Sequence, residues 1–382
     1  MRAISSALLL IASFLINRQA AKAASAKSDY LVYTGTFTTS ATSNSKGIYA
    51  FRYHTANHEL TPLGLAAEIA SPSFIAIAPN GNYLYSVSAV AEGTVSAFRI
   101  DFQTGKLIQL NTVSSHGGGP CHLLVDRTGK SLFVANFRTG SVAGLRILVD
   151  GSLQEPASFY QAAGTSTDPV KQTGPHEHSV NIPRSDKFML VTDLGLDKIF
   201  SYRIDTAGAL LSTNDPPFVS AQAGAGPRHM AFTPDERYVY VVNEIQSTVS
   251  AFRYDAELGS LHEFQTVSAL PEHFSGENTG AEIEVDQSGR FVYSSNRGND
   301  SIAQFSINPK DGSLSLIGQT STGGKTPRYF ALDPSGDYLF AANQDSNSIS
   351  FFDVDRKTGR LTPTGKTIQT PTPVCIKFVA IP

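Results

Sequence analysis

The chain has few of the residues that would tie it to a polyanionic partner. Only 16% of its 382 residues are charged, the formal net charge is −3, and no segment carries a run of like charge. Nucleic acids and anionic membrane surfaces bind proteins through clustered Lys and Arg side chains. We therefore expect neither as a partner, and the oligomeric state is not set by the sequence.

Long apolar runs are also missing. The one candidate, Ala7 to Ile16, follows a short basic start and precedes small residues. It is too short for an uncleaved membrane anchor, which needs about 20 apolar residues. The pattern is typical of a secretory signal peptide, with cleavage after about Ala23 or Ala26. We expect residues 1–26 to be removed and residues 27–382 to form one periplasmic or secreted domain, with no stable membrane association after cleavage.

What the sequence has instead is a repeat. A segment that begins at Pro or Gly and continues as an apolar strand pattern returns at intervals of 46 to 55 residues. Its copies start at Pro72, Pro120, Pro175, Pro227, Gly280, Pro327 and Pro373. All but the last continue through a Gly-containing turn into three more strand patterns. Repeats of this length with four short strands are typical of propeller blades.

The two ends of the chain complement each other. The last copy stops after one strand pattern at Pro382, whereas the segment from Tyr30 to Leu63 supplies three strand patterns without a first one. We therefore predict an all-β fold, a seven-bladed β-propeller with four antiparallel strands per blade. Pairing of the N- and C-terminal strands would close the ring and remove its exposed edges.

Cysteine is nearly absent. Cys121 and Cys375 are the only two, and they fall on first strands two blades apart. A disulfide needs α-carbons about 4.4–6.8 Å apart. We expect no disulfide.

Two positions of the repeat change from copy to copy. The residue after the initial Pro or Gly reads Ser73, Cys121, His176, Arg228, Ala281, Arg328 and Val374. The residue after an Asn or Asp that ends the second strand reads Phe137, Leu194, Glu244, Arg297 and Gln344. Because adjacent strands are antiparallel, both positions lie on one face of the ring. In a repeat whose other positions stay similar, a position that changes in every copy indicates functional side chains.

These positions predict one axial cavity, ringed by His176, Arg228, Glu244, Arg297 and Arg328. We expect further polar side chains close by in the same layer, namely His122, His229, Glu282 and Gln344. His178, at a position that is apolar in other copies, is interpreted as a buried, hydrogen-bonded histidine.

Several stretches together resemble the signature segments of a known family. They are Gly174-Pro175-His176-Glu177-His178-Ser179-Val180, Thr192-Asp193-Leu194-Gly195-Leu196-Asp197, Gly226-Pro227-Arg228-His229-Met230, Val242-Asn243-Glu244 and Ser295-Asn296-Arg297-Gly298-Asn299-Asp300-Ser301-Ile302. The family is that of the seven-bladed propeller lactonases, which includes the bacterial propeller-type 6-phosphogluconolactonase and the fungal carboxy-muconate lactonising enzyme. The resemblance covers essentially the whole chain from Tyr30. It implies that His176, Arg228, Glu244 and Arg297 match the proposed active site of the family.

The residue types suit lactone hydrolysis, a carboxylic-ester hydrolysis that needs a base near neutral pH and help for an oxyanion. We assign His176 as general base, Arg228 or Arg297 to the oxyanion or the anionic group of the substrate, and Glu244 to holding an arginine or the histidine in place. His122, His229, Glu282, Arg328 and Gln344 are assigned to substrate binding. The expected partner is a small lactone or an anionic sugar acid, and the reaction needs no cofactor.

Other interpretations stay open. The pentose phosphate pathway is cytoplasmic, so an exported member of the family could act on another lactone. The same groups could form a lactone from a diacid, as a muconate-type cycloisomerase does. A metal-dependent propeller lactonase, with His122, His229 and Glu282 as ligands, and a non-catalytic binding propeller are the other two alternatives.

Overall fold

The computed structural model describes residues 29–39 and 43–382, and the regular structure in this part of the chain is 28 β-strands. The expected signal peptide, residues 1–26, lies outside the described residues. A search of the described residues finds no helix long and apolar enough to cross a membrane.

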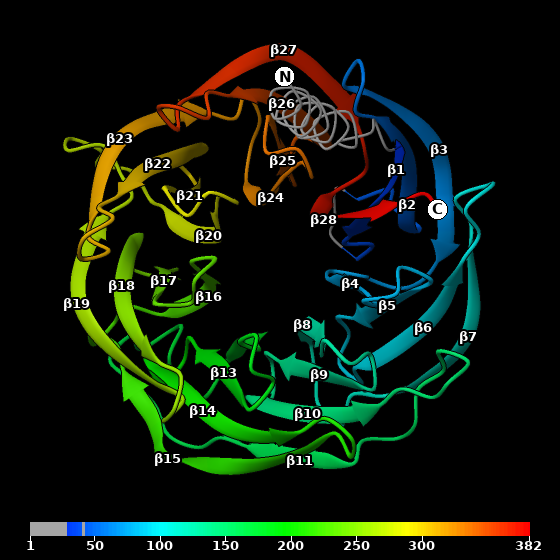
Figure 1. Cartoon of the computed structure of the whole chain (residues 1–382), viewed down its shortest axis with the longest axis horizontal. Coiled ribbons are helices and arrows are strands. Elements are labelled where there is room, and N and C mark those ends of the chain that lie inside the picture. Colours follow the sequence, from blue (N-terminus) through cyan, green and yellow to red (C-terminus); the bar gives the residue numbers. More distant parts are fainter. Residues whose placement is uncertain (1–28, 40–42) are drawn as a thin grey trace, which may run out of the picture.

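The strands form seven antiparallel sheets of four, arranged as blades around an axis (Figure 1). The blade that joins the termini contains, from the axis outwards, β28 (Pro373–Ala380), β1 (Asp29–Thr36), β2 (Gly47–His54) and β3 (Glu59–Glu68). The next three are β4 (Ile75–Ile77), β5 (Tyr83–Ser88), β6 (Thr94–Ile100) and β7 (Leu107–Ser114); β8 (Pro120–Val125), β9 (Ser131–Asn136), β10 (Ser141–Arg146) and β11 (Ser158–Gln161); and β12 (Glu177–Asn181), β13 (Phe188–Asp193), β14 (Lys198–Asp205) and β15 (Leu210–Ser220). The last three are β16 (Pro227–Phe232), β17 (Tyr238–Asn243), β18 (Thr248–Asp255) and β19 (Ser260–Ser268); β20 (Thr279–Val285), β21 (Phe291–Arg297), β22 (Ser301–Ile307) and β23 (Leu314–Ser321); and β24 (Pro327–Leu332), β25 (Tyr338–Asn343), β26 (Ser348–Val354) and β27 (Leu361–Gln369). The predicted seven-bladed propeller is confirmed.

The ring closes as the sequence predicts. The C-terminal strand β28 pairs with β1 along its length, from Tyr30 opposite Ala380 to Thr34 opposite Ile376. In Figure 1 the red end of the chain lies beside the blue beginning. The closing strand buries Val374, Ile376 and Val379, each at most 3% exposed. The terminal strand is therefore part of the core rather than a loose end.

Burial falls from the axis to the rim because each blade stacks its faces on two neighbours. The second strand of a blade is covered on both faces, and all six residues of β9 and of β17 are buried. The outermost strands alternate or are largely exposed, as in β27. Blades are also joined by hydrogen bonds: the Tyr240 hydroxyl donates to the Gly312 carbonyl in the next blade at 2.8 Å.

Candidate active site

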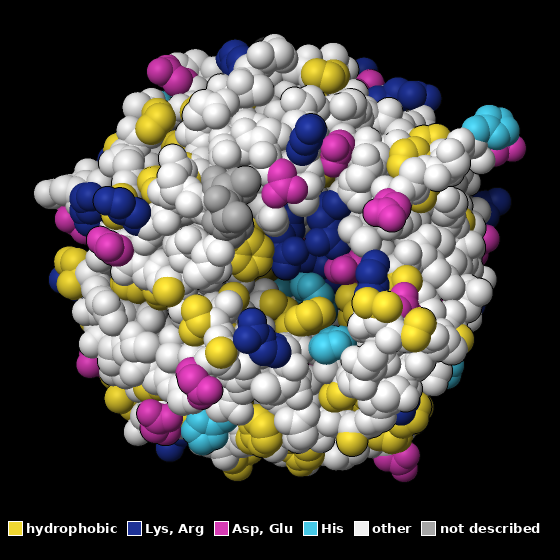
Figure 2. Space-filling model, turned by 180° about the vertical axis from the view of Figure 1, so that it is seen from behind, with side chains coloured by type: hydrophobic (Ala, Val, Ile, Leu, Met, Phe, Trp, Pro, Cys, Tyr) yellow, Lys and Arg dark blue, Asp and Glu magenta, His cyan; other side chains and the backbone are white. Residues whose placement is uncertain are grey.

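A cavity of about 360 Å³ lies on the axis, at the end of the ring where the inner strands begin. Figure 2 shows an axial hollow in which basic, acidic and histidine side chains gather. The lining consists of Phe37, Ser73, Ala89, Gly119, Cys121, Phe137, Arg138, His176, His178, Glu244 and Arg328. We refer to it as the first cavity.

A β-bulge at the start of the inner strands supplies part of this lining. In β16, Pro227 pairs with Asn243 but His229 pairs with Val242, so Arg228 has no partner in the ladder. The strands β8 and β24 skip Cys121 and Arg328 in the same way. A bulge re-aims the unpaired side chain. Two of these three bulge residues, Cys121 and Arg328, line the first cavity.

The blade that contains β12 departs from the register expected from the sequence. Glu177 pairs with Asp193 and Ser179 with Thr192, so the bulge residue is His178. His176 precedes the strand, and its carbonyl accepts from Leu194 N as the Gly226 carbonyl accepts from Glu244 N. Counting from Pro175 therefore misaligned this copy by two residues, because His178 and not His176 is equivalent to Arg228. His178 is buried, at 3% exposed, as the sequence predicts, and it contacts Cys121, but the bulge also places it in the cavity wall together with His176.

Glu244 joins two arginines from neighbouring blades. Its Oε2 lies 2.9 Å from Arg228 Nε and 2.8 Å from Arg297 Nη2. Arg228 also donates to the Ala281 carbonyl at 2.6 Å, and Arg297 to the Gly280 carbonyl at 2.9 Å. Burial opposes ionisation of Glu244, but Arg297, Arg228 and Arg328 outweigh it and lower its pKa to about 2. The cluster thus holds one net positive charge beside the cavity.

We expect Glu244→Gln to destabilise the fold by about 3–5 kcal/mol, because it leaves two buried guanidinium groups without their anion. Equilibrium urea unfolding at pH 7 measures this loss. The matched control is Asp337→Asn, which breaks an exposed pair with Arg356 of 3.4 Å and should cost about 1 kcal/mol or less. Equal losses in the two variants would contradict a structural role for the Glu244 cluster.

His176 binds through one ring nitrogen, and its Nε2 has no hydrogen-bond partner among the described residues. Its Nδ1 lies 2.8 Å from the Phe137 carbonyl oxygen, which can only accept, so Nδ1 carries a proton. Its ring stacks on Phe137, with centroids 4.6 Å apart and planes inclined by 17°. The neutral imidazole therefore keeps Nε2 as a proton acceptor. These contacts fix the tautomer that a general base needs.

Asp193 fixes the backbone at His176. One carboxylate oxygen of Asp193 accepts from the backbone N–H groups of His176, Gly195 and Leu196 at 2.9–3.0 Å. Burial raises the pKa of Asp193 to about 6 and that of Glu177, its partner across the ladder, to about 9. Glu177 therefore stays protonated at neutral pH, which avoids two buried like charges.

Two cations in the lining of this cavity, Arg328 and the exposed Arg138, form no ion pair among the described residues. Within residues 29–39 and 43–382 the Arg328 guanidinium has no ion pair or hydrogen bond, and it lies 5.1 Å from the centroid of the Phe37 ring. Burial and the neighbouring Arg228 and Arg297 lower its pKa to about 9, so it stays charged at neutral pH. Arg228 and Arg297 already bind Glu244, and Arg138 is exposed to solvent, which weakens its electrostatic interactions. The less exposed Arg328 is therefore the group best placed to bind an anion.

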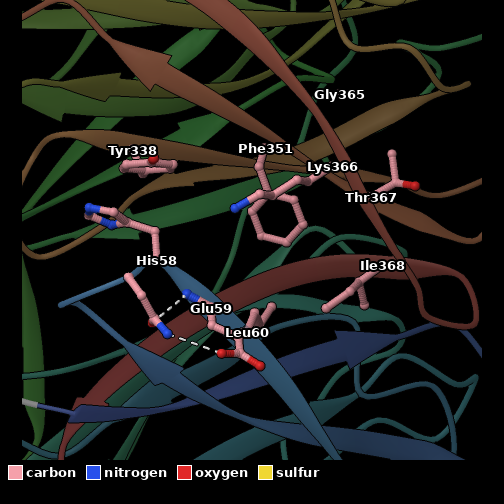
Figure 3. Close-up of a pocket in the computed structure, with 10 residues that line it drawn as sticks. His58, Glu59, Leu60, Tyr338, Phe351, Gly365, Lys366, Thr367 and Ile368 are labelled. Carbon is pink, nitrogen blue, oxygen red and sulfur yellow. Dashed lines mark hydrogen bonds between the residues drawn. The ribbon is translucent and has the colours of Figure 1, made fainter.

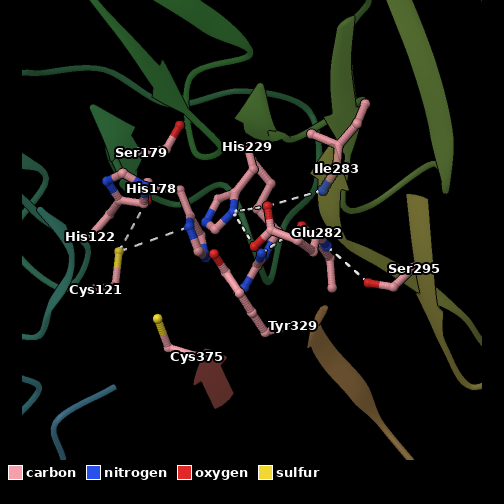
Figure 4. Close-up of polar contacts among 12 residues, drawn as sticks. Cys121, His122, His178, Ser179, His229, Glu282, Ile283, Ser295, Tyr329 and Cys375 are labelled. Atoms are coloured by element: carbon pink, nitrogen blue, oxygen red, sulfur yellow. Dashed lines mark hydrogen bonds and ion pairs between the residues drawn. The ribbon is translucent and has the colours of Figure 1, made fainter. Parts of the chain in front are cut away.

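The structure separates the other predicted residues from the first cavity. His122, His229 and Glu282 line a second axial cavity of about 420 Å³, further along the inner strands. His229 Nδ1 lies 3.0 Å from Glu282 Oε2 (Figure 4). Gln344 lines neither cavity, and its amide donates to Asp345 at 3.0 Å. The expectation of a single layer was wrong for these four residues.

The histidines between the two cavities are packed against each other. The ring centroid of His229 is 5.0 Å from that of His178 and 5.2 Å from that of His122. Among the described residues, no group of three or more His, Cys, Asp or Glu side chains is arranged to hold a metal ion. Instead, His229 and Glu282 bind each other, and His122 accepts from the Val180 backbone at 3.4 Å.

Both cysteines are free. Cys121 lies at the wall of the first cavity, with its Sγ 3.3 Å from the His178 carbonyl and 3.8 Å from His178 Nδ1. Burial raises the pKa of this thiol to about 12. Cys121 is thus a neutral thiol at physiological pH and not a ready nucleophile.

Sequence reasoning missed the aromatic wall of the first cavity. Phe37 follows β1 as Phe137 follows β9. The Phe37 backbone N–H donates to the carbonyl of Thr372, which precedes β28, and the Phe137 N–H donates to the carbonyl of Gly119, which precedes β8. Phe37 therefore occupies the same variable repeat position as Glu244. Extending the repeat alignment into the first strand of the chain would have found it.

A further cavity, of about 620 Å³, lies at the rim between β3 and β27 (Figure 3). His58 lines this cavity, and its Nδ1 is hydrogen-bonded to the Tyr53 hydroxyl at 2.8 Å. The His58 ring stacks on the Tyr338 ring, with centroids 3.9 Å apart. None of the predicted site residues lines this cavity. The first cavity, on the axis, is the one that brings together arginine, histidine and glutamate side chains, and we therefore take it as the candidate active site.

Comparisons with known proteins agree with this architecture. The family model described as "Lactonase, 7-bladed beta-propeller" matches residues 31–378. The 6-phosphogluconolactonase of Bacillus subtilis is 38% identical over 352 residues, 92% of this chain and 98% of that protein. The 6-phosphogluconolactonase of Formosa agariphila is 33% identical over 74% of this chain and 81% of its own length. The structure of the periplasmic gluconolactonase of Pseudomonas aeruginosa superposes with a TM-score of 0.87 at 30% identity, covering 93% of this chain and all of that one.

Proposed function

Because the chain belongs to the seven-bladed β-propeller lactonase family, we propose that it hydrolyses a sugar-type lactone in the first cavity. The observation that carries this proposal is the proximity of a free imidazole nitrogen to a free guanidinium. His176 donates through Nδ1 to the Phe137 carbonyl, and Arg328 lines the same cavity without an anionic partner among the described residues. A base and an anion site in one cavity are what ester hydrolysis at neutral pH needs.

In the proposed mechanism, His176 Nε2 removes a proton from a water molecule as that water attacks the lactone carbonyl carbon. The negative charge that develops on the carbonyl oxygen is stabilised by the positive potential of the Arg228–Glu244–Arg297 cluster and of Arg328. The ring C–O bond then breaks, and the protonated imidazole returns the proton to the leaving alkoxide. The product is the open-chain hydroxy acid, and the histidine is regenerated.

Within this mechanism Arg228 and Arg328 have different roles. Arg228 is 2% exposed and bound to Glu244 and a backbone carbonyl, so it positions Glu244 rather than touching the substrate. We assign the binding of an anionic substituent of the substrate, phosphate or carboxylate, to Arg328, because a guanidinium can bind either group through two hydrogen bonds.

Hydrolysis of gluconolactone and of its 6-phosphate, followed by the acid released at constant pH, tests both assignments. We expect Arg328→Met to raise KM for the phosphorylated lactone by about tenfold or more, since it removes charge-assisted hydrogen bonds of about 1.5–3 kcal/mol. The unphosphorylated lactone should be much less affected. Arg184→Met, at an exposed rim arginine, is the control.

Two outcomes would contradict these assignments separately. Equal wild-type rates on both lactones, with Arg328→Met affecting them alike, would remove the phosphate-binding role of Arg328. No hydrolysis of any aldonolactone by the wild type would contradict the proposed activity itself.

We propose that the protein acts in the periplasm or outside the cell. Residues 1–26 have the pattern of a secretory signal peptide, and the similar Pseudomonas aeruginosa gluconolactonase is described as periplasmic. An enzyme in that compartment meets sugar lactones from outside the cytoplasm. Cell fractionation with N-terminal sequencing tests this location, and an intact N-terminus in the cytoplasmic fraction would contradict it.

A further inference from the structure

The second axial cavity has no role in the proposed hydrolysis. It lies between the C-terminal halves of the inner strands. Its lining includes Ala76 and Ile77 at the end of β4, and Leu124 and Val125 at the end of β8. The imidazoles of His178 and His229 stand between it and the first cavity (Figure 4). It is therefore a separate space at the opposite end of the axis.

This cavity contains a cation without a counter-ion. Lys377 donates to the Tyr329 hydroxyl at 2.7 Å and lies 4.8 Å from the centroid of the Phe74 ring. In the part of the chain that the structure describes, its ammonium forms no ion pair within 4.0 Å. An ammonium group that is partly buried without an anion is unfavourable, so binding an anion here is favoured.

The acidic side chains nearby form no ion pair with Lys377 among the described residues, because each is held by another group. The Glu282 carboxyl is bound to His229, and Glu284 Oε2 accepts from the Leu332 backbone N–H at 3.0 Å. Burial raises the pKa of Glu282 to about 7 and that of Glu284 to about 8, which disfavours their charged forms.

His122 adds a hydrogen-bond donor to the same cavity. Its Nδ1 accepts from the Val180 N–H, and burial holds its pKa well below the ordinary value, so the ring is neutral with its proton on Nε2. His122 is 8% exposed, and no described residue accepts a hydrogen bond from its Nε2. Like Lys377, it lies against the Phe74 ring, with centroids 4.1 Å apart.

One part of the wall is apolar, formed by Ile77, Leu124, Val125, Met230 and Phe378. The polar side chains of Asn181 and Tyr329 also line the cavity. A small ligand is held best when its apolar part meets such a wall and a few polar groups fix its orientation. One cation and one neutral donor match a single negative charge better than a doubly charged phosphate.

We propose that the second cavity binds a monocarboxylate with a compact apolar body. The carboxylate lies between Lys377 Nζ and His122 Nε2, and the body packs against Leu124, Val125 and Phe378. The site is distinct from the one proposed for lactone hydrolysis and does not depend on that activity.

Titration calorimetry of the full chain with benzoate at pH 7 tests the proposal. We expect Lys377→Met, which keeps the length of the side chain, to raise Kd by about tenfold or more through loss of a charge-assisted hydrogen bond. Lys377→Arg should retain most of the affinity, and His122→Phe should weaken binding while keeping the ring on Phe74. Because Arg328 is proposed to bind a carboxylate in the first cavity, the variants are also compared in an Arg328→Met background, where benzoate should keep its Kd for the second cavity.

The outcomes separate the proposal from its rivals. Thermal melting shows whether each variant folds, and if Lys377→Met does not, Lys377→Arg and His122→Phe carry the test. Absence of benzoate binding to the wild type, equal affinity for benzyl alcohol, or tighter binding of gluconate would each overturn the proposed ligand class. Loss of binding in Arg328→Met but not in the Lys377 variants would place the ligand in the first cavity and overturn the proposed site.

Discussion

Replacing His176 by alanine should lower kcat for lactone hydrolysis by about 10²–10⁴-fold, the usual contribution of general-base catalysis. KM should change much less, because the imidazole Nε2 acts on the attacking water rather than on the substrate. The fold should be nearly unaffected, since His176 is only half-buried and its contacts are one hydrogen bond to Phe137 O and the stack on the Phe137 ring. Steady-state kinetics on the variant and thermal melting check the two halves of this expectation.

His58→Ala is the matched control for His176→Ala, because His58 is also a cavity histidine stacked on an aromatic ring, but at the rim. Its activity per folded molecule should equal that of the wild type. His178→Ala separates the two histidines of the first cavity. If His178→Ala loses the activity and His176→Ala keeps it, the base is the bulge histidine of β12 and the assignment of His176 is wrong.

Deletion of residues 373–382 should abolish the cooperative fold. It removes β28 entirely, the inner strand of the blade that closes the ring. The buried side chains Val374, Ile376 and Val379 contribute about 1.5–3 kcal/mol each. Their sum is comparable to the whole stability of a typical protein, about 5–15 kcal/mol. The exposed edge of β1 would also favour aggregation.

Circular dichroism and urea unfolding of the truncated chain measure this effect. Deletion of Ile381 and Pro382 alone is the control, because it leaves β28 intact. It removes one backbone hydrogen bond, from Ile381 N to Asp29 O at 3.0 Å, and the partly buried Ile381 side chain. This shorter deletion should cost about 1–3 kcal/mol. A two-state melt near the wild-type Tm after the ten-residue deletion would show that the ring holds without its closing strand.

Much of the fold follows from the sequence because a propeller repeats one local unit. Turn residues and apolar alternation mark each strand, and the missing strands at one end match the surplus strand at the other. The position that follows the second strand also identified Glu244 and Arg297 from variation alone. The sequence also predicts that Glu244 holds an arginine or the histidine. That Glu244 binds Arg228 of its own blade and Arg297 of the next at once could not be predicted, because it depends on the spacing of neighbouring blades.

The sequence by itself therefore determined the strand pattern of a blade, the number of blades, the closure of the ring and the two variable positions that face the axis. Tertiary structure alone decided which residues share a cavity. The pairing of Glu177 with Asp193 shifts β12 by two residues, so that His178 and not His176 occupies the bulge. Consecutive residues such as Cys121 and His122 are divided between two cavities. The physical reason is that hydrogen bonds between strands set the register and the bulges, and those bonds join residues that no local pattern relates.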